Sequence, residues 1–380
     1  MDILSLEKFK NIFSRPQKTN RSFDDFFIHS KVKIGSRLFP LKDYAVKKNI
    51  EMENLKLLFE YIQNCNHYLE RFYTLSLRID NGSSRLRCMK PMKNGEMNNN
   101  AESLSKNIIR NIHWQDILQN TKSGIENIPT FIDVLQDLFL RDIIDYKIVT
   151  PSSLFYLKNG RLGSVFSSYY FRASIMNPYL VYSLNESILK GTRIFTPTLG
   201  WSSYCYGFLE SKRVLEYVGT DVIPSVCEKT KQMAKIISPG KTVDIYCKPS
   251  EDLYRSRKFL DTYREHFDVV FFSPPYYRLE LYEGKMQSTE KYKSYQEWLS
   301  KYWEATIQLC YHVLEKGGRL CYILSGYGSQ NTKDQYDLLK DMNNITKKYF
   351  KLKSQQPMYN KNVNVTSHRE TAEQIMIFIK

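Results

Sequence analysis

The sequence lacks several features that would assign the protein to a simple class. No run of about 18 apolar residues occurs among its 380 residues, so we expect no membrane span. The N-terminus, Met1 to Lys8, lacks the basic and apolar regions of a signal peptide. The seven cysteines form no Cys-x-x-Cys pair and no cluster with histidine, which disfavours a zinc site and a disulfide framework. These absences predict a soluble, intracellular protein without a metal.

What the chain has in excess is positive charge and aromatic side chains. The formal net charge is +15, and 14% of the residues are aromatic, including 28 tyrosines. Basic side chains interleaved with aromatic ones suit phosphate contact and base stacking, so nucleic acid is the expected polyanionic partner. A generally lysine-rich proteome with A/T-rich codons is the alternative explanation of the charge.

The first part of the chain, residues 1–150, reads as a mainly helical, basic region. Apolar residues recur at helical spacing over residues 51–73 and 130–146. Residues 80–103 are mostly polar, carry no apolar period and predict a long loop. No motif assigns this region, and we keep both a scaffold role and a target-recognition role open for it.

The second part, residues 151–380, alternates short apolar runs with helical patterns. Strands are expected at residues 192–195, 217–220, 243–247, 268–272, 319–324 and 374–379. Helices are expected at residues 177–189, 203–210, 223–236, 294–314 and 331–348. This alternation predicts an α/β domain with a doubly wound, mostly parallel sheet. A segment around residues 350–352 would pair with the last strand as an antiparallel edge.

The most informative motif is Ser273-Pro274-Pro275-Tyr276, which follows the apolar strand ending at Phe272. Proline cannot continue a central strand, so the chain leaves the sheet rigidly at a carboxyl end, where open α/β sheets bind their ligands. A plain strand-ending turn is the alternative.

Two upstream strand ends carry further candidate ligand residues. Gly200 lies in the turn after the strand at 192–195, and Asp221 ends the next strand about 20 residues later, which is the dinucleotide-binding spacing. Asp221 can accept hydrogen bonds from a ribose diol or can cap the helix that follows it. After the third strand, Ser250 and Glu251 can reach an adenine, and Ser250 can equally cap a helix.

Together these motifs resemble the S-adenosylmethionine-dependent amino-methyltransferases of DNA, including a branch found in large phages and viruses. The resemblance covers about residues 165–380 and implies a Rossmann-like class I fold with a seven-stranded, mostly parallel sheet. It implies catalytic roles for the Ser273–Tyr276 turn. It also implies that the cofactor, S-adenosyl-L-methionine, is bound by residues in four segments: Phe171 and Arg172; Thr196, Pro197, Leu199 and Gly200; Asp221; and Ser250 and Glu251.

The first cofactor loop departs from the family pattern at two positions. The family usually has an acid where this chain has Thr196, and a second glycine where it has Ser202. Because the acid helps to hold the amino group of the cofactor, the departure predicts weaker cofactor binding or an inactive, nucleic-acid-binding or structural paralogue.

The resemblance also implies the acceptor. Serine before Pro-Pro-Tyr is more typical of N4-cytosine than of N6-adenine methylation, and DNA is the expected partner, with RNA or a protein glutamine as alternatives. Residues Tyr277, Arg278, Lys285 and Lys291 follow the turn and are expected to contact nucleic acid, or else to form a solvated loop. The resemblance is compatible with a viral or phage protein in cytoplasm or nucleus, and it leaves the oligomeric state open.

Overall fold

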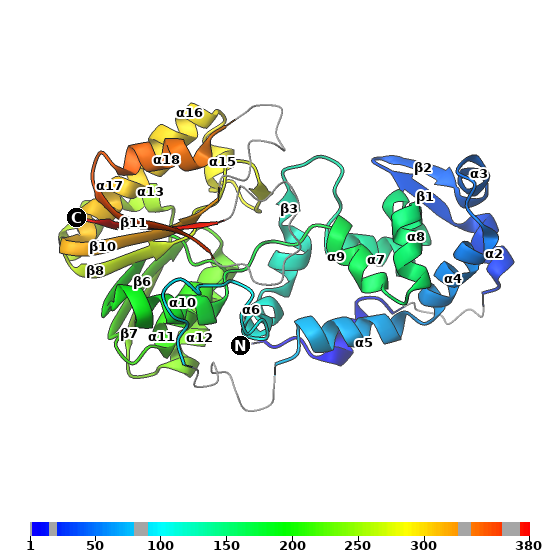
Figure 1. Cartoon of the computed structure of the whole chain (residues 1–380), viewed down its shortest axis with the longest axis horizontal. Helices are drawn as coiled ribbons and strands as arrows, with labels where there is room; N and C mark the ends of the chain where they lie inside the picture. Colours follow the sequence, from blue (N-terminus) through cyan, green and yellow to red (C-terminus); the bar gives the residue numbers. More distant parts are fainter. Residues whose placement is uncertain (1, 15–20, 80–89, 326–335, 359–372) are drawn as a thin grey trace. The chain divides into compact units, whose positions relative to one another are not determined.

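The computed structural model describes residues 2–14, 21–79, 90–325, 336–358 and 373–380 (Figure 1). By their internal contacts these residues form two compact units. The sheet unit comprises residues 79–113 and 174–380, and the N-terminal unit comprises residues 2–78 and 114–173. The single division expected near residue 150 therefore differs from the contacts, because residues 79–113 group with the sheet and residues 151–173 with the N-terminal unit.

The sheet unit is built on seven strands in the order β11-β12-β10-β8-β5-β6-β7. Only β12 runs antiparallel to its neighbours, and the other paired strands are parallel. The predicted α/β class and mostly parallel sheet are confirmed. The strands are β5 (Arg193–Thr196), β6 (Glu216–Asp221), β7 (Thr242–Cys247), β8 (Phe267–Phe272), β10 (Leu314–Leu324), β11 (Lys351–Pro357) and β12 (Gln374–Ile379).

Strand β8 lies in the middle of the sheet because its side chains are apolar on both faces. Five of its six residues are buried, as the continuous run of Phe and Val predicts for a strand covered on both sides. All six predicted strands are present, and the predicted edge hairpin is present as β11 and β12. Strand β10 begins five residues earlier than expected, before a register shift between Leu314 and Arg319.

Helices cover the two faces of this sheet, as Figure 1 shows for α10, α11 and α12 on one side and α13, α17 and α18 on the other. Helix α12 begins with Pro224, whose fixed φ suits the first turn. The first five residues of the helix expected at 331–348 lie outside the described residues, and the described helix is α18. The helices and helical turns of this unit are α6 (Ser105–Ile112), α10 (Pro178–Leu184), η3 (Asn185–Leu189), α11 (Ser203–Glu210), α12 (Pro224–Ile237), α13 (Ser250–Leu253), α14 (Arg257–Thr262), α15 (Ser288–Lys291), α16 (Tyr295–Glu297), η4 (Trp298–Trp303), α17 (Glu304–Val313) and α18 (Leu338–Thr346); the short strand β9 is Glu280–Leu281.

The N-terminal unit is mostly helical but also contains a small sheet in the order β2-β1-β4. The helix expected over 51–73 is interrupted at Asn64, and the helix expected over 130–146 ends at Leu140 and gives way to β4. Its elements are α1 (Leu6–Asn11), α2 (Phe23–His29), β1 (Lys31–Ile34), β2 (Arg37–Pro40), α3 (Leu41–Lys47), α4 (Met52–Gln63), α5 (Cys65–Ser76), η1 (Asp116–Asn120), β3 (Lys122–Ser123), α7 (Phe131–Leu140), β4 (Ile143–Asp145), η2 (Tyr146–Val149), α8 (Pro151–Lys158) and α9 (Leu162–Tyr169).

Residues 90–104 contain no helix or strand, as predicted for this part of the loop. They are nevertheless fixed to the sheet unit. Met97 is buried, and the Asn99 side chain accepts a hydrogen bond from the Asn177 N–H at 2.7 Å. Within the described part of the chain, no helix combines the length and apolar character needed to cross a membrane.

Candidate active site

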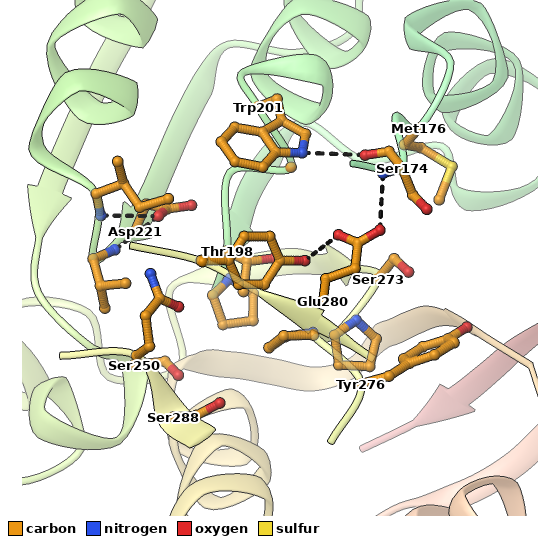
Figure 2. Close-up of a pocket in the computed structure, with 18 of the residues that line it drawn as sticks. Ser174, Met176, Thr198, Trp201, Asp221, Ser250, Ser273, Tyr276, Glu280 and Ser288 are labelled. Atoms are coloured by element: carbon orange, nitrogen blue, oxygen red, sulfur yellow. Dashed lines mark hydrogen bonds between the residues drawn. The ribbon is translucent and has the colours of Figure 1, made fainter. Parts of the chain in front are cut away.

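A cavity of about 200 Å³ opens at the carboxyl ends of β5, β6, β7 and β8 (Figure 2). It joins segments that the sequence analysis selected separately. Nine predicted site residues line it: Pro197, Gly200, Asp221, Ser250, Glu251, Ser273, Pro274, Pro275 and Tyr276.

The loop after β5 forms one wall of the cavity with an unusual backbone. Gly200, Trp201 and Ser202 all have positive φ, at 52°, 58° and 67°. A Cβ atom at Gly200 would lie 2.3 Å from the ring of Tyr204, so only glycine fits there. The Tyr204 hydroxyl accepts a hydrogen bond from the Ser273 N–H at 3.1 Å, and it thereby ties the first loop to the Ser-Pro-Pro-Tyr turn.

Asp221, at the end of β6, connects this loop to the start of α12. One carboxylate oxygen accepts the Leu199 N–H at 3.1 Å, and the other accepts the N–H groups of Val222 and Ile223 at 2.8 and 3.1 Å. The cavity role and the capping role foreseen for Asp221 therefore coexist. Leu199 itself does not line the cavity but positions the carboxylate.

The Ser273–Tyr276 turn presents a hydroxyl and an aromatic ring to the cavity. The Ser273 hydroxyl donates its proton to the Ile323 carbonyl at 3.1 Å, so the lone pairs of the Ser273 oxygen can still accept hydrogen bonds. The Tyr276 hydroxyl accepts the Ser325 N–H at 2.7 Å, and burial raises the pKa of Tyr276. Both side chains are thus held by the neighbouring strand β10 and its end.

The segment after β7 forms another part of the lining. Ser250 does not cap α13, because it is the first residue of that helix and Pro249 occupies the N-cap position; its hydroxyl lies 2.8 Å from that of Thr306. Glu251 is buried, and its carboxylate accepts from the Lys291 ammonium at 2.8 Å. Nearby, the buried Tyr302 hydroxyl has no hydrogen-bond partner among the described residues, although Tyr302 lines the cavity.

Thr196 does not line the cavity. It is fully buried, and its hydroxyl lies 2.6 Å from that of Tyr217. The position at which the family usually has an acid is therefore occupied in this chain by one half of a neutral, buried hydrogen-bonded pair.

The two predicted residues upstream, Phe171 and Arg172, belong to the N-terminal unit. Phe171 pairs its backbone with Pro129 and Phe131, and the Arg172 guanidinium lies 5.4 Å from the Phe131 ring centroid. Neither residue lines the cavity, whereas the next segment, Ser174 to Met176, does.

The predicted nucleic-acid residues fall into two groups. Tyr277 is buried and donates to the Lys293 carbonyl at 2.8 Å, and Lys291 is bound to Glu251 and Asp252, so both are engaged within the protein. Arg278 and Lys285 are exposed, although the Arg278 guanidinium also donates to the Lys293 carbonyl at 3.2 Å.

Several cavity residues were not selected from the sequence. Glu280 accepts from the Ser174 N–H at 2.9 Å and from the Tyr282 hydroxyl at 2.6 Å, while the Trp201 indole donates to the Ser174 carbonyl at 3.1 Å (Figure 2). Glu280 lies only four residues after Tyr276, and this proximity to the Ser273–Tyr276 turn was the available signal. No group of three or more metal-binding side chains occurs within the described ranges.

Comparisons with known proteins find only structural similarity at low sequence identity. No protein-family model matches the chain, and no curated protein matches it. Similar solved structures include the N-methyltransferase NodS from Bradyrhizobium japonicum WM9 in complex with S-adenosyl-L-homocysteine, at 11% identity and TM-score 0.36, covering 53% of this chain and 83% of that chain. TrmN from Thermus thermophilus is 13% identical with TM-score 0.36, covering 53% and 48% of the two chains. A predicted O-methyltransferase, Atu636 from Agrobacterium tumefaciens, is 13% identical with TM-score 0.32, covering 50% and 74%.

The strand order gives the chain an α/β fold with a seven-stranded, mostly parallel sheet, as predicted. A fold of this kind hosts many reactions, so the substrate must be inferred from the cavity.

Proposed function

We propose that the protein transfers a methyl group from S-adenosyl-L-methionine to the exocyclic amino group of a DNA base, with N4 of cytosine favoured over N6 of adenine. The observation that carries this proposal is the position of the Ser273–Tyr276 turn. It lines the same cavity as Gly200 and Asp221, the residues expected to hold the cofactor.

The cavity residues fit the cofactor. Asp221 is placed to accept from a ribose diol, and the backbone at Gly200 allows close approach. The buried Tyr302 hydroxyl has no hydrogen-bond partner among the described residues. It can bond to the polar edge of an adenine that lies near Ser250. When bound, the cofactor supplies an electrophilic methyl group on its sulfonium.

The protein's contribution to the reaction is positioning of the acceptor amine. Because the proton of Ser273 is donated to Ile323, the hydroxyl oxygen can accept a hydrogen from the amino group of the base. The resemblance gives the Pro274 carbonyl the same role. Two such acceptors draw the amine toward tetrahedral geometry and expose its lone pair. Tyr276, anchored at Ser325, offers a ring for stacking on a flipped base.

The direct test is incubation of the full chain with labelled S-adenosylmethionine and DNA, RNA or protein, followed by mass spectrometry of the nucleosides. N4-methylcytosine in DNA supports the proposal; label in RNA or protein alone contradicts it. Ser273→Ala should lower turnover on the order of 100-fold with cofactor binding retained. Ser300→Ala, an exposed serine bonded to its own helix, is the matched control with unchanged turnover.

A second candidate function is a catalytically inactive methyltransferase-fold protein that binds nucleic acid or serves as a structural subunit. The neutral Thr196–Tyr217 pair favours it, because the first loop carries no charge at the position of the usual acid. Calorimetry separates the two candidates: absence of S-adenosylmethionine binding at millimolar concentration would select the inactive protein.

A further inference from the structure

Glu280 is a buried carboxylate in the cavity whose hydrogen-bond donors, the Tyr282 hydroxyl and the backbone and side chain of Ser174, are all neutral. It is 9% exposed and lines the cavity. One oxygen accepts from the backbone N–H of Ser174 and the other from the Tyr282 hydroxyl. A carboxylate has about four lone-pair sites, so a cation can bind without displacing these donors.

The other cavity carboxylates are differently engaged. Glu251 is paired with Lys291, and Asp221 accepts three backbone N–H groups. Glu373 interacts electrostatically with Lys106. Glu280 is more deeply buried than Asp221 and, unlike Glu251 and Glu373, interacts with no cation among the described residues.

Burial makes the charge of Glu280 costly. Removal from water raises the pKa of this carboxyl, and the bonds to Tyr282 and Ser174 offset only part of that effect. A cation close to a buried carboxylate recovers the lost solvation through a charge-assisted hydrogen bond. A ligand carrying an ammonium group would thus stabilise the ionised form.

The residues around Glu280 indicate where in the cavity such an ammonium group would bind. Ser174 donates to Glu280 through its N–H and accepts from the Trp201 indole through its carbonyl, so the carboxylate lies where the 174–176 segment meets the Gly200 loop (Figure 2). Thr196, the last residue of β5 before this loop, bonds to Tyr217 and offers no charge to the cavity.

We propose that Glu280 binds the α-ammonium group of the cofactor's methionine moiety, and so supplies from the segment after the catalytic turn the negative charge that Thr196 does not provide. This inference rests on the proposed function. It predicts that Glu280, and not the residue at position 196, recognises the amino group of the cofactor.

The test is calorimetric titration of the full chain with S-adenosyl-L-homocysteine and with its analogue lacking the α-amino group. The wild type should bind the first ligand at least about tenfold more tightly than the second. Glu280→Gln should lose this preference by weakening only the first ligand. The control Glu283→Gln, at an exposed acid three residues away, should behave as the wild type. Should Glu280→Gln fail to fold, Glu280→Asp retracts the charge by one methylene and should show the same selective loss.

Three results would overturn the proposal. The first is equal binding of both ligands by the wild type, and the second is a Glu280→Gln variant that keeps the full preference. In a third case Glu280→Gln keeps both affinities but loses methyl transfer, which would assign the carboxylate to the base. Failure of the wild type to bind S-adenosyl-L-homocysteine at all is a distinct outcome, because it refutes the proposed function and this inference with it.

Discussion

His113 is the buried end of a hydrogen-bonded chain that supports the loop after β5. Its Nε2 lies 2.8 Å from the Ser202 hydroxyl, which lies 2.6 Å from the Thr230 hydroxyl. Thr230 donates its proton to the Val226 carbonyl at 2.7 Å, so Ser202 donates to Thr230 and the His113 Nε2–H donates to Ser202. Nδ1 of His113 has no partner among the described residues, and the imidazole is therefore neutral.

This arrangement predicts a loss of stability in mild acid. Burial lowers the pKa of His113 to about 3 from an ordinary 6.5. Between these values the unfolded chain binds a proton that the folded chain does not, so the free energy of unfolding falls as pH falls below 6.5. At 1.36 kcal/mol per pH unit, this one group lowers the free energy of unfolding by about 2 kcal/mol at pH 5.

Urea unfolding at pH 7 and pH 5 measures this effect. His113→Gln keeps an N–H donor for Ser202 but cannot gain a proton, so its free energy of unfolding should change by about 2 kcal/mol less than that of the wild type between the two pH values. His67→Gln, at an exposed histidine, should keep the wild-type difference. An identical pH dependence in His113→Gln and the wild type would refute the neutral, buried imidazole.

Two further predictions concern the departures in the first loop. Ser202→Ala removes the bonds to His113 and Thr230 but keeps the positive φ, so it should cost about 2 kcal/mol in the free energy of unfolding. Ser202→Gly also relieves the left-handed strain and should be about 1 kcal/mol more stable than Ser202→Ala; equal stability would contradict the strain. Thr196→Val leaves the Tyr217 hydroxyl unpaired and should cost about 1–3 kcal/mol in urea unfolding, with unchanged affinity for S-adenosyl-L-homocysteine in calorimetry. A weaker affinity would show that Thr196 does contact the cofactor.

The sheet could be predicted from the sequence because local signals determine its strands. Apolar runs such as residues 268–272 end at proline or an acid, and these limits are visible without any long-range contact. The small sheet of the N-terminal unit was missed for the opposite reason. Strand β2 is exposed throughout and has no alternating pattern, so only pairing with β1 defines it. The grouping of residues 79–113 with the sheet unit likewise depends on contacts distant in sequence.

The site residues also divide into those that local sequence signals predict and those that depend on contacts distant in the chain. Asp221 and Ser273 follow strands directly, so strand order alone brings them to one edge of the sheet. Tyr204, Glu280 and Tyr302 reach the cavity from helix α11, the short strand β9 and the helical turn η4. Their roles depend on partners far away in the chain, such as the Tyr204 hydroxyl at the Ser273 N–H, and no spacing rule records such pairs.

The two departures of the first loop have different physical meanings. At Ser202 the side chain replaces a glycine, yet the backbone keeps a left-handed φ of 67°, and the hydroxyl bonds to His113 and Thr230 offset the strain. The shape of the loop is thus retained. At Thr196 the charge itself is absent, and a buried bond to Tyr217 removes the side chain from the cavity. A loop with the right shape and no charge leaves the recognition of an ammonium group to another residue, and Glu280 is a cavity carboxylate held by neutral donors.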